Sequence, residues 1–222
     1  QFTDTHLFGT AGETLRGIAT QVTLEATLRQ AQRHVERADA LIVSGDLVQD
    51  DPSGYEPFRH VFGALGKPVL TLPGNHDDPA AMRTALDRSP FQYCGHRDLG
   101  GWRIVMVDSI IVGAAGGRVG PAALQSLRAS LSGAGARHVL VCLHHHPVPM
   151  RSRWLDTVGL ENPQEFFAVL DEHPQVRAVL WGHVHQGYDA ERRGVRLHVG
   201  GVGLLGFVLI GQQQALAAVM KP

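Results

Sequence analysis

Five short clusters of metal-binding side chains are spread along most of the chain. They are Asp4-Thr5-His6, Gly45-Asp46, Gly74-Asn75-His76-Asp77, His144-His145-His146 and Gly182-His183-Val184-His185. Together they offer seven or more nitrogen and oxygen ligands, which is more than a single ion needs. Such a set suits two transition-metal ions that share a carboxylate, and a two-metal site clamps the attacking and leaving oxygens of a phosphoryl displacement. The clusters therefore predict a phosphoesterase.

Each cluster follows an apolar run that reads as a buried strand. The expected strands cover residues 40–44, 68–72, 102–108, 138–143 and 176–181, and helical periodicity falls on residues 22–37, 55–65, 122–131 and 163–172. Strands that alternate with helices predict an α/β fold. In such folds ligands collect where loops leave the carboxyl ends of the strands, and the clusters have that position.

The composition favours one domain that acts on a small molecule. A chain of 222 residues is long enough for a core of its own, so we expect a single domain over residues 1–222. The 20 Lys and Arg nearly balance the 21 Asp and Glu, and without a basic run neither nucleic acid nor a membrane surface is an expected partner. Cys94 and Cys142 have no CxxC spacing, which favours the reducing cytoplasm. The chain opens in what reads as the middle of a strand, so we expect a few preceding residues to be missing.

Asp46 is the predicted bridging ligand. It follows Gly45, whose conformational freedom permits the tight turn that would push the carboxylate among the loops. One imidazole nitrogen cannot serve two ions, so the bridge requires a carboxylate. Asp4 and His6 would point to one face of an extended chain and could reach one ion together, although an isolated D-x-H is also compatible with a helix cap or a turn. Asp50 is interpreted as a cap or a hydrogen-bond acceptor and not as a ligand.

The Gly74-Asn75-His76-Asp77 cluster is the sharpest short signal. Asn75 can offer its amide oxygen to an ion and its NH2 group to a phosphate oxygen. His76 is the expected general acid that protonates the leaving alkoxide, and Asp77 is a candidate to orient its imidazole. A glycine turn that merely contains these residues is the alternative.

The remaining two clusters are rich in histidine. Neighbours on an extended segment point to opposite sides, so the three consecutive histidines supply one ligand, or two at most. We select His144 as the ligand. We expect His145 to support a ligand without binding the ion or to lie near the phosphate, and His146 is the weakest candidate of the three. His183 and His185 are two residues apart, and they could bind one ion together or divide between two ions.

The order D-x-H, GD, GNHD, HH-x-P and GHxH resembles the calcineurin-like metallophosphoesterase superfamily. Within it, the fuller wording is similar to that of the bacterial class III 3′,5′-cyclic AMP phosphodiesterases. That wording comprises Thr3-Asp4-Thr5-His6-Leu7-Phe8, Gly45-Asp46-Leu47-Val48-Gln49-Asp50, Leu143-His-His-His-Pro-Val-Pro149, Trp154-Leu155-Asp156, Gly159-Leu160-Glu161-Asn162 and Trp181-Gly-His-Val-His-Gln186. The resemblance extends over residues 2–197.

The resemblance implies a four-layer α/β/β/α sandwich with a dinuclear metal centre at one edge. It assigns Asp4, His6 and His185 to the first ion and Asn75, His144 and His183 to the second. Asp46 would bridge them, and His76 would be an acid that binds no ion. Nitrogen and oxygen ligands without a thiolate suit Mn, Fe, Co or Zn, as divalent or mixed-valence ions, and do not separate these metals.

The implied activity is hydrolysis of 3′,5′-cyclic AMP to AMP by in-line attack of a hydroxide that bridges two ions. A broader phosphodiesterase that acts on 2′,3′-cyclic nucleotides or glycerophosphodiesters would use the same ligands. A non-catalytic scaffold is disfavoured because every ligand position is filled, and a nuclease or protein phosphatase because no basic track or inserted domain occurs. A homodimer stays open.

Residues 198–222 depart from the family pattern. This tail is apolar, interrupted by glycines, and carries no charge before Lys221. It is too short in unbroken apolar length to span a membrane, and we expect buried strands there. A truncated or altered end is the alternative.

Overall fold

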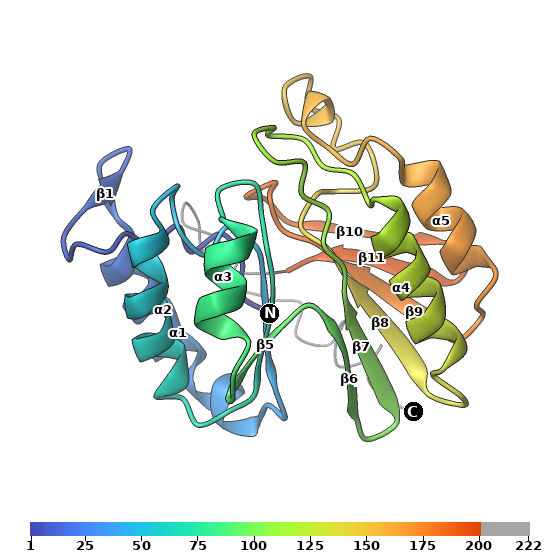
Figure 1. Ribbon diagram of the computed structural model, residues 1–222, viewed down its shortest axis with the longest axis horizontal. Coiled ribbons are helices and arrows are strands. Elements are labelled where there is room, and N and C mark those ends of the chain that lie inside the picture. The colour runs from blue at the N-terminus through green and yellow to red at the C-terminus, as the bar shows by residue number, and fades with distance from the viewer. Residues whose placement is uncertain (201–222) are drawn as a thin grey trace.

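The computed structural model describes residues 1–200, and two β-sheets packed face to face form its centre (Figure 1). The smaller sheet has three parallel strands in the order β3 (Leu41–Ser44), β4 (Val69–Leu72) and β5 (Phe91–Tyr93). Phe2 adds an isolated parallel bridge to Val43. The N-terminal segment thereby runs beside β3.

The larger sheet has six strands in the order β10-β11-β9-β8-β7-β6. Their bounds are β6 Gly95–Leu99, β7 Trp102–Met106, β8 His138–Cys142, β9 Val176–Leu180, β10 Tyr188–Arg192 and β11 Val195–Val199. Strands β7, β8, β9 and β11 are parallel, and the antiparallel strands β6 and β10 form the two edges. A small hairpin of β1 (Thr14–Leu15) and β2 (Ile18–Ala19) precedes the first helix.

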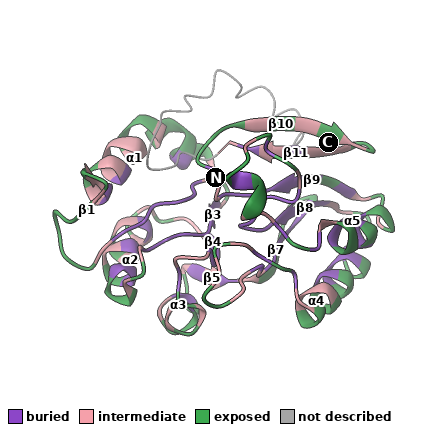
Figure 2. Ribbon diagram, turned by 90° about the horizontal axis from the view of Figure 1, so that it is seen from above, coloured by how far each residue is buried: buried purple, intermediate pink, exposed green. Residues whose placement is uncertain are grey.

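Helices cover the outer face of each sheet, so the predicted four-layer α/β/β/α sandwich is confirmed (Figures 1 and 2). The smaller sheet is covered by α1 (Thr20–Arg37), α2 (Tyr55–Gly63) and α3 (Pro79–Leu86). The larger sheet is covered by α4 (Pro121–Ser132) and α5 (Pro163–Asp171). Short 3-10 turns, η1 (Pro52–Gly54) and η2 (Leu155–Thr157), lie in the loops.

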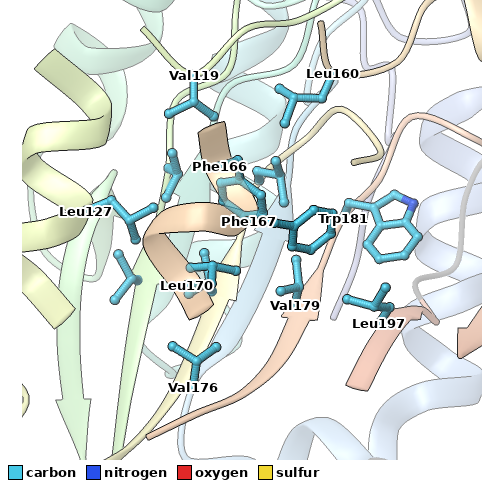
Figure 3. Packing of buried hydrophobic residues seen from close by; sticks show 14 of the residues in the cluster. Val119, Leu127, Leu160, Phe166, Phe167, Leu170, Val176, Val179, Trp181 and Leu197 are labelled. Atoms are coloured by element: carbon cyan, nitrogen blue, oxygen red, sulfur yellow. The ribbon is translucent and has the colours of Figure 1, made fainter. Parts of the chain in front are cut away.

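Three hydrophobic clusters fill the three interfaces between the layers. Strand residues alternate between them, as the period of two requires. In β8, Leu140 and Cys142 face the smaller sheet, whereas Val139 and Val141 face the helices. Figure 3 shows the outer cluster, in which Phe166 and Leu170 of α5 pack near Val179 of β9. Burial on both faces explains why these strands are apolar throughout.

Every predicted strand and helix is present, with end points within about two residues of the expected ones. Among residues 1–200, the sequence patterns missed β1, β2, α3, β5, β6, β10 and β11. Four residues in a row of β6 are exposed, so its pattern lacks the apolar signal of a buried strand.

The atypical tail of residues 198–222 begins inside a strand, because β11 ends at Val199. Residues 201–222, where we expected buried strands, lie outside the described residues. The single domain over residues 1–222 stays a prediction. No helix within residues 1–200 has the length and apolar character to cross a membrane.

Candidate metal centre

The five clusters meet at one edge of the sandwich. Asp46 follows β3, Asn75 and His76 follow β4, His144 follows β8, and His183 and His185 follow β9. Because β3 and β4 are parallel, and β8 and β9 are parallel, their carboxyl ends lie side by side. The backbone N–H groups of Asp4 and His6 donate to the carbonyls of Gly45 and Asp46, which brings the first cluster to the same edge.

Asp4, His6 and His185 form a first group of converging ligand atoms. Nε2 of His185 lies 3.2 Å from Oδ1 of Asp4. It also lies 3.4 Å from Nε2 of His6, so the two imidazoles point toward each other. Asp4 is fully buried and is fixed by the hydroxyl of Thr3 and by the backbone N–H of His183. This group joins the N-terminal segment to the loop after β9.

Asp46, His144 and His183 form a second group. Oδ2 of Asp46 lies 3.3 Å from Nε2 of His144 and 3.8 Å from Nε2 of His6. One carboxylate oxygen therefore faces both groups, which is the position that a shared ligand requires. The structure thus divides His183 and His185 between the two groups.

Charge interactions within the second group set the protonation of its three members. Burial alone would raise the pKa of Asp46, but the charge and hydrogen bond of His144 outweigh it and hold that pKa well below its usual range. Burial alone would lower the pKa of His144, yet the charge of Asp46 raises the pKa of His144 to about 9. Burial, with the charge of His144, lowers the pKa of His183 to about 3, so that imidazole is neutral. A neutral imidazole and an ionised carboxylate are the forms that bind metals, so Asp46 and His183 suit an ion as they are, whereas His144 must release a proton when an ion binds.

The backbone conformation at the site corrects the expectation of extended segments. Asp4 and His6 have φ values of 55° and 44°, and His183 and His185 have values of 69° and 50°. These values lie in the left-handed region of backbone conformations, which residues other than glycine rarely adopt. The chain turns sharply at each of these residues because it leaves a strand and immediately forms hydrogen bonds to a neighbouring loop. Strain of this kind clusters at functional sites.

Two glycines of the motifs are required by close approach. A Cβ at Gly45, where φ is +95°, would overlap the imidazole of His144. A Cβ at Gly74 would overlap the carboxylate of Asp46. Because each glycine lacks a Cβ, a metal-ligand side chain from another cluster can pack directly against its backbone.

Within the part of the chain that the structure describes, Asn75 and His183 each have a buried polar atom without a hydrogen-bond partner, and a metal ion would be a suitable partner for both. Within residues 1–200, the buried Oδ1 of Asn75 and the buried Nε2 of His183 have no hydrogen-bond partner. A buried polar atom without a partner costs about 1–3 kcal/mol, so native proteins rarely leave one unsatisfied. Both atoms are electron-pair donors, and together with the two groups they fit transition-metal ions.

The three consecutive histidines diverge as expected. Nδ1 of His144 lies 2.8 Å from the carbonyl oxygen of Ser44, so Nδ1–H donates and Nε2 faces Asp46. His145 turns to the hydroxyl of Ser109, at 2.9 Å from its Nδ1, and His146 stacks on the His183 ring. Neither His145 nor His146 belongs to the groups of converging ligand atoms found within residues 1–200.

His76 is oriented by Asp50 and not by Asp77. Its Nδ1 lies 3.1 Å from both carboxylate oxygens of Asp50 and 2.9 Å from Nε2 of Gln49, while its backbone N–H donates to Oδ1 of Asp46. Asp77 instead accepts hydrogen bonds from the N–H groups of Leu47 and Gly74 and from the hydroxyl of Tyr55. The interpretation of Asp77 was wrong because the residue after His76 turns back under the loop into the core.

A third group of ligand atoms contains His76 itself, together with His6 and Asp46. The His6 and His76 rings are 5.2 Å apart between centroids. His76 is therefore close enough to the shared carboxylate either to act on a substrate bound there or to bind an ion. Its Nδ1 is occupied by Asp50 and Gln49, so only Nε2 is available for either role.

A cleft of about 350 Å³ opens over the ligand groups. Its lining includes His6, Asp46, Asn75, His76, His183 and His185. The other lining residues include Leu15, Arg16 and Trp154, which sequence reasoning did not assign to the site. Neither Arg16 nor Trp154 is a metal-ligand type, so the ligand pattern does not single them out, although Trp154 belongs to the wording that resembles the family.

Comparison with known proteins supports the same chemistry. A family model described as calcineurin-like phosphoesterase matches residues 1–187. The 3′,5′-cyclic adenosine monophosphate phosphodiesterase CpdA of Pseudomonas aeruginosa is 40% identical over 200 residues, which cover 89% of this chain and 72% of that protein. CpdA of Escherichia coli K12 is 37% identical over 199 residues, with the same two coverages of 89% and 72%. A 3′,5′-cyclic-nucleotide phosphodiesterase of Nostoc is 33% identical over 196 residues, which cover 88% of this chain and 74% of that protein.

Solved structures share the fold at low sequence identity. A dimetal phosphatase from Danio rerio superposes with a TM-score of 0.70 at 15% identity, covering 91% of this chain and 86% of the other. TT1561 of Thermus thermophilus superposes with a TM-score of 0.63, also at 15% identity, covering 90% and 87%. These likenesses concern the arrangement of the layers and not the substrate.

Proposed function

The chain belongs to the calcineurin-like phosphoesterase family of metal-dependent phosphoesterases, and we propose that it hydrolyses 3′,5′-cyclic AMP to AMP. The observation that carries the proposal is the convergence of two ligand groups on the single carboxylate of Asp46. The substrate is inferred from the 33–40% identity, over most of the chain, to relatives named as cyclic-nucleotide phosphodiesterases.

Seven side chains would hold two metal ions. We assign Asp4, His6 and His185 to one ion and Asn75, His144 and His183 to the other. Asp46 is assigned to both. When bound, two such ions polarise the phosphate and lower the pKa of a water so that it can attack phosphorus in line with the leaving oxygen. Mn, Fe, Co and Zn all suit the ligand set, and the choice among them stays a prediction.

The protein's own groups prepare the site before substrate arrives. The Nδ1–H of His144 donates to the Ser44 carbonyl, which fixes the ring with Nε2 toward Asp46. A partner of this kind on the far nitrogen orients metal-binding histidines in general. Asn75 can direct its amide NH2 toward a phosphate oxygen of the substrate while its Oδ1 serves as ligand. The fixed donors do not have to reorganise as charge develops on the phosphate.

His76 is the proposed general acid. Its Nδ1 faces the carboxylate of Asp50, so Nε2 is the ring nitrogen free to deliver a proton to the leaving ribose 3′-oxygen. The side chain is about one-third exposed at the cleft, so it can reach a bound substrate. The arrangement is that of an acid oriented by a carboxylate on the far side of its ring.

The direct test is steady-state hydrolysis of 3′,5′-cyclic AMP by Mn-reconstituted protein, with 2′,3′-cyclic AMP and bis(p-nitrophenyl) phosphate beside it. We expect a clear preference for the 3′,5′ ring. Turnover of only the 2′,3′ ring or the activated ester would keep the metal chemistry and refute the cyclic AMP assignment. The second candidate is therefore a broader phosphodiesterase with the same seven ligands. Cytoplasmic location and a homodimer stay predictions from the sequence.

A further inference from the structure

The exposed side chain of Trp154 lines the catalytic cleft. Its exposed fraction is 69%, whereas Trp102 and Trp181 are 7% and 0% exposed. Within residues 1–200, the exposed large hydrophobic side chains are Trp154, Val22 and Val112, and of these Trp154 alone lines the cleft. An exposed indole in a cleft beside a ligand cluster offers a flat apolar surface on which a ligand can pack.

The segment that carries Trp154 is held in place. Leu155, which follows it, is buried in the outer cluster under the larger sheet. Asp156 accepts a hydrogen bond from the backbone N–H of Met150 at 2.6 Å, and the hydroxyl of Thr157 donates to the Trp154 carbonyl at 2.7 Å. The turn η2 therefore presents the indole from an anchored support, which lowers the entropy cost of binding against it.

The lining of the cleft combines two kinds of side chain. One kind is polar or charged, and it comprises the histidine, aspartate and asparagine residues of the metal centre together with Arg16 and Gln49. The other kind comprises Trp154 and the apolar side chains of Leu15, Ala115, Val158 and Val184. A ligand that fills the cleft must therefore combine an anionic group with a flat or apolar group. A nucleotide has this character, with the phosphate at one end and the base at the other.

We propose that Trp154 binds the nucleobase of the substrate by stacking its indole on the base. This inference rests on the proposed function, since the phosphate at the ligand groups sets where the base can lie. Stacking uses the π-face that all bases share, so Trp154 contributes affinity for a nucleotide without selecting adenine over other bases. It is a substrate-binding residue and takes no part in proton transfer.

The first experiment measures iodide quenching of tryptophan fluorescence in the zinc-reconstituted protein. Iodide reaches Trp154 far more readily than the two buried indoles, so quenching reports on this side chain. AMP should protect Trp154 from iodide, and ribose 5-phosphate, which lacks the base, should not. AMP that binds by calorimetry and leaves the quenching unchanged would overturn the inference.

The second experiment compares cyclic AMP with the methyl riboside 3′,5′-cyclic phosphate, which has the same reacting ring and no base. Trp154→Ala should raise KM for cyclic AMP about tenfold with kcat retained, because loss of one stacked aromatic weakens base binding by that order. KM for the base-free ring should not change. Trp154→Phe should restore most of the affinity, and Val112→Ala, which removes an exposed side chain outside the cleft, should match the parent protein.

The outcomes separate the two proposals. If cyclic AMP is hydrolysed and Trp154→Ala affects both substrates equally, the stacking role is wrong and the phosphodiesterase function stands. If cyclic AMP is not hydrolysed but AMP protects Trp154, the base site stands and the cyclic AMP assignment is wrong. If neither hydrolysis nor protection occurs, both are refuted.

Discussion

The smaller sheet and the larger sheet contribute differently to the same edge. The smaller sheet and the N-terminal segment beside it supply every oxygen atom assigned as a ligand, together with two imidazoles at the cleft. These residues are Asp4, His6, Asp46, Asn75 and His76. The larger sheet supplies only imidazoles, from His144, His183 and His185. The negative charge therefore lies on one side of the interface between the sheets.

The two assigned ligand groups mix residues from the two sheets. The first joins Asp4 and His6 to His185, and the second joins Asp46 to His144 and His183. Neither sheet alone presents these sets, so the centre forms only when the hydrophobic cluster between the sheets brings their carboxyl ends together. That dependence can be tested from both sides.

The largest effect should follow from removing the shared carboxylate. Asp46→Ala should lose both ions and lower kcat/KM by about a thousandfold or more, because the bound metals supply several kcal/mol of transition-state stabilisation. Metal content by mass spectrometry and cyclic AMP hydrolysis measure the two effects. Asp87→Ala removes an exposed carboxylate at the end of α3 and should change neither. A variant at Asp46 that kept two ions would show that the bridge is elsewhere.

Removing one imidazole from the larger sheet should empty one half of the centre. His185→Ala should lose the ion held with Asp4 and His6, whereas His183→Ala should lose the ion held with Asp46 and His144. Each variant should retain about one ion per chain, since each side chain lies in only one group. Metal titration by calorimetry distinguishes a remaining site from none. Loss of both ions in either variant would mean that the groups are not separate.

His76 offers a test within the smaller-sheet side. His76→Ala should retain two ions and lose about 10²- to 10⁴-fold in kcat for cyclic AMP, because a poor leaving group needs a proton. Bis(p-nitrophenyl) phosphate releases a stable phenolate and should suffer less. His60→Ala, which removes an exposed histidine on α2, serves as the control. Equal losses on both substrates would exclude the acid role, and loss of one ion would make His76 a ligand.

The smallest effect on activity should follow from weakening the hydrophobic packing between the two sheets. Leu72→Ala and Leu127→Ala each truncate a fully buried leucine, the first between the sheets and the second under α4. Both should lower the free energy of unfolding by about 2–5 kcal/mol, measured by urea denaturation. Only Leu72→Ala should also weaken metal binding, by about tenfold at most. Equal metal affinity in the two variants would show that the sheets do not need this contact to align the ligands.

Much of the fold could be predicted because its signals are local. The strands that are buried on both faces, among them β3, β4 and β8, are short apolar runs in the sequence. The exposed edge strand β6 has no such pattern, and β10 alternates only between partly buried and exposed residues. Their places depend on pairing with β7 and β11, which a local pattern does not encode.

The features of the candidate site also divide into those with a local signal in the sequence and those that depend on tertiary packing. The sequence by itself determined which residue types stand at strand ends, and therefore the ligand chemistry of Asp46, Asn75 and the histidine clusters. Only the tertiary structure decided that Asp50, and not Asp77, contacts His76, and that Trp154 overlooks the cleft. It also separated His183 from His185, whose partners Asp46 and Asp4 are more than a hundred residues away in the chain. Residue types and their spacing are given by the sequence directly, and they indicate local structure and ligand chemistry. The distance between two ligands, in contrast, depends on how both sheets and their loops pack.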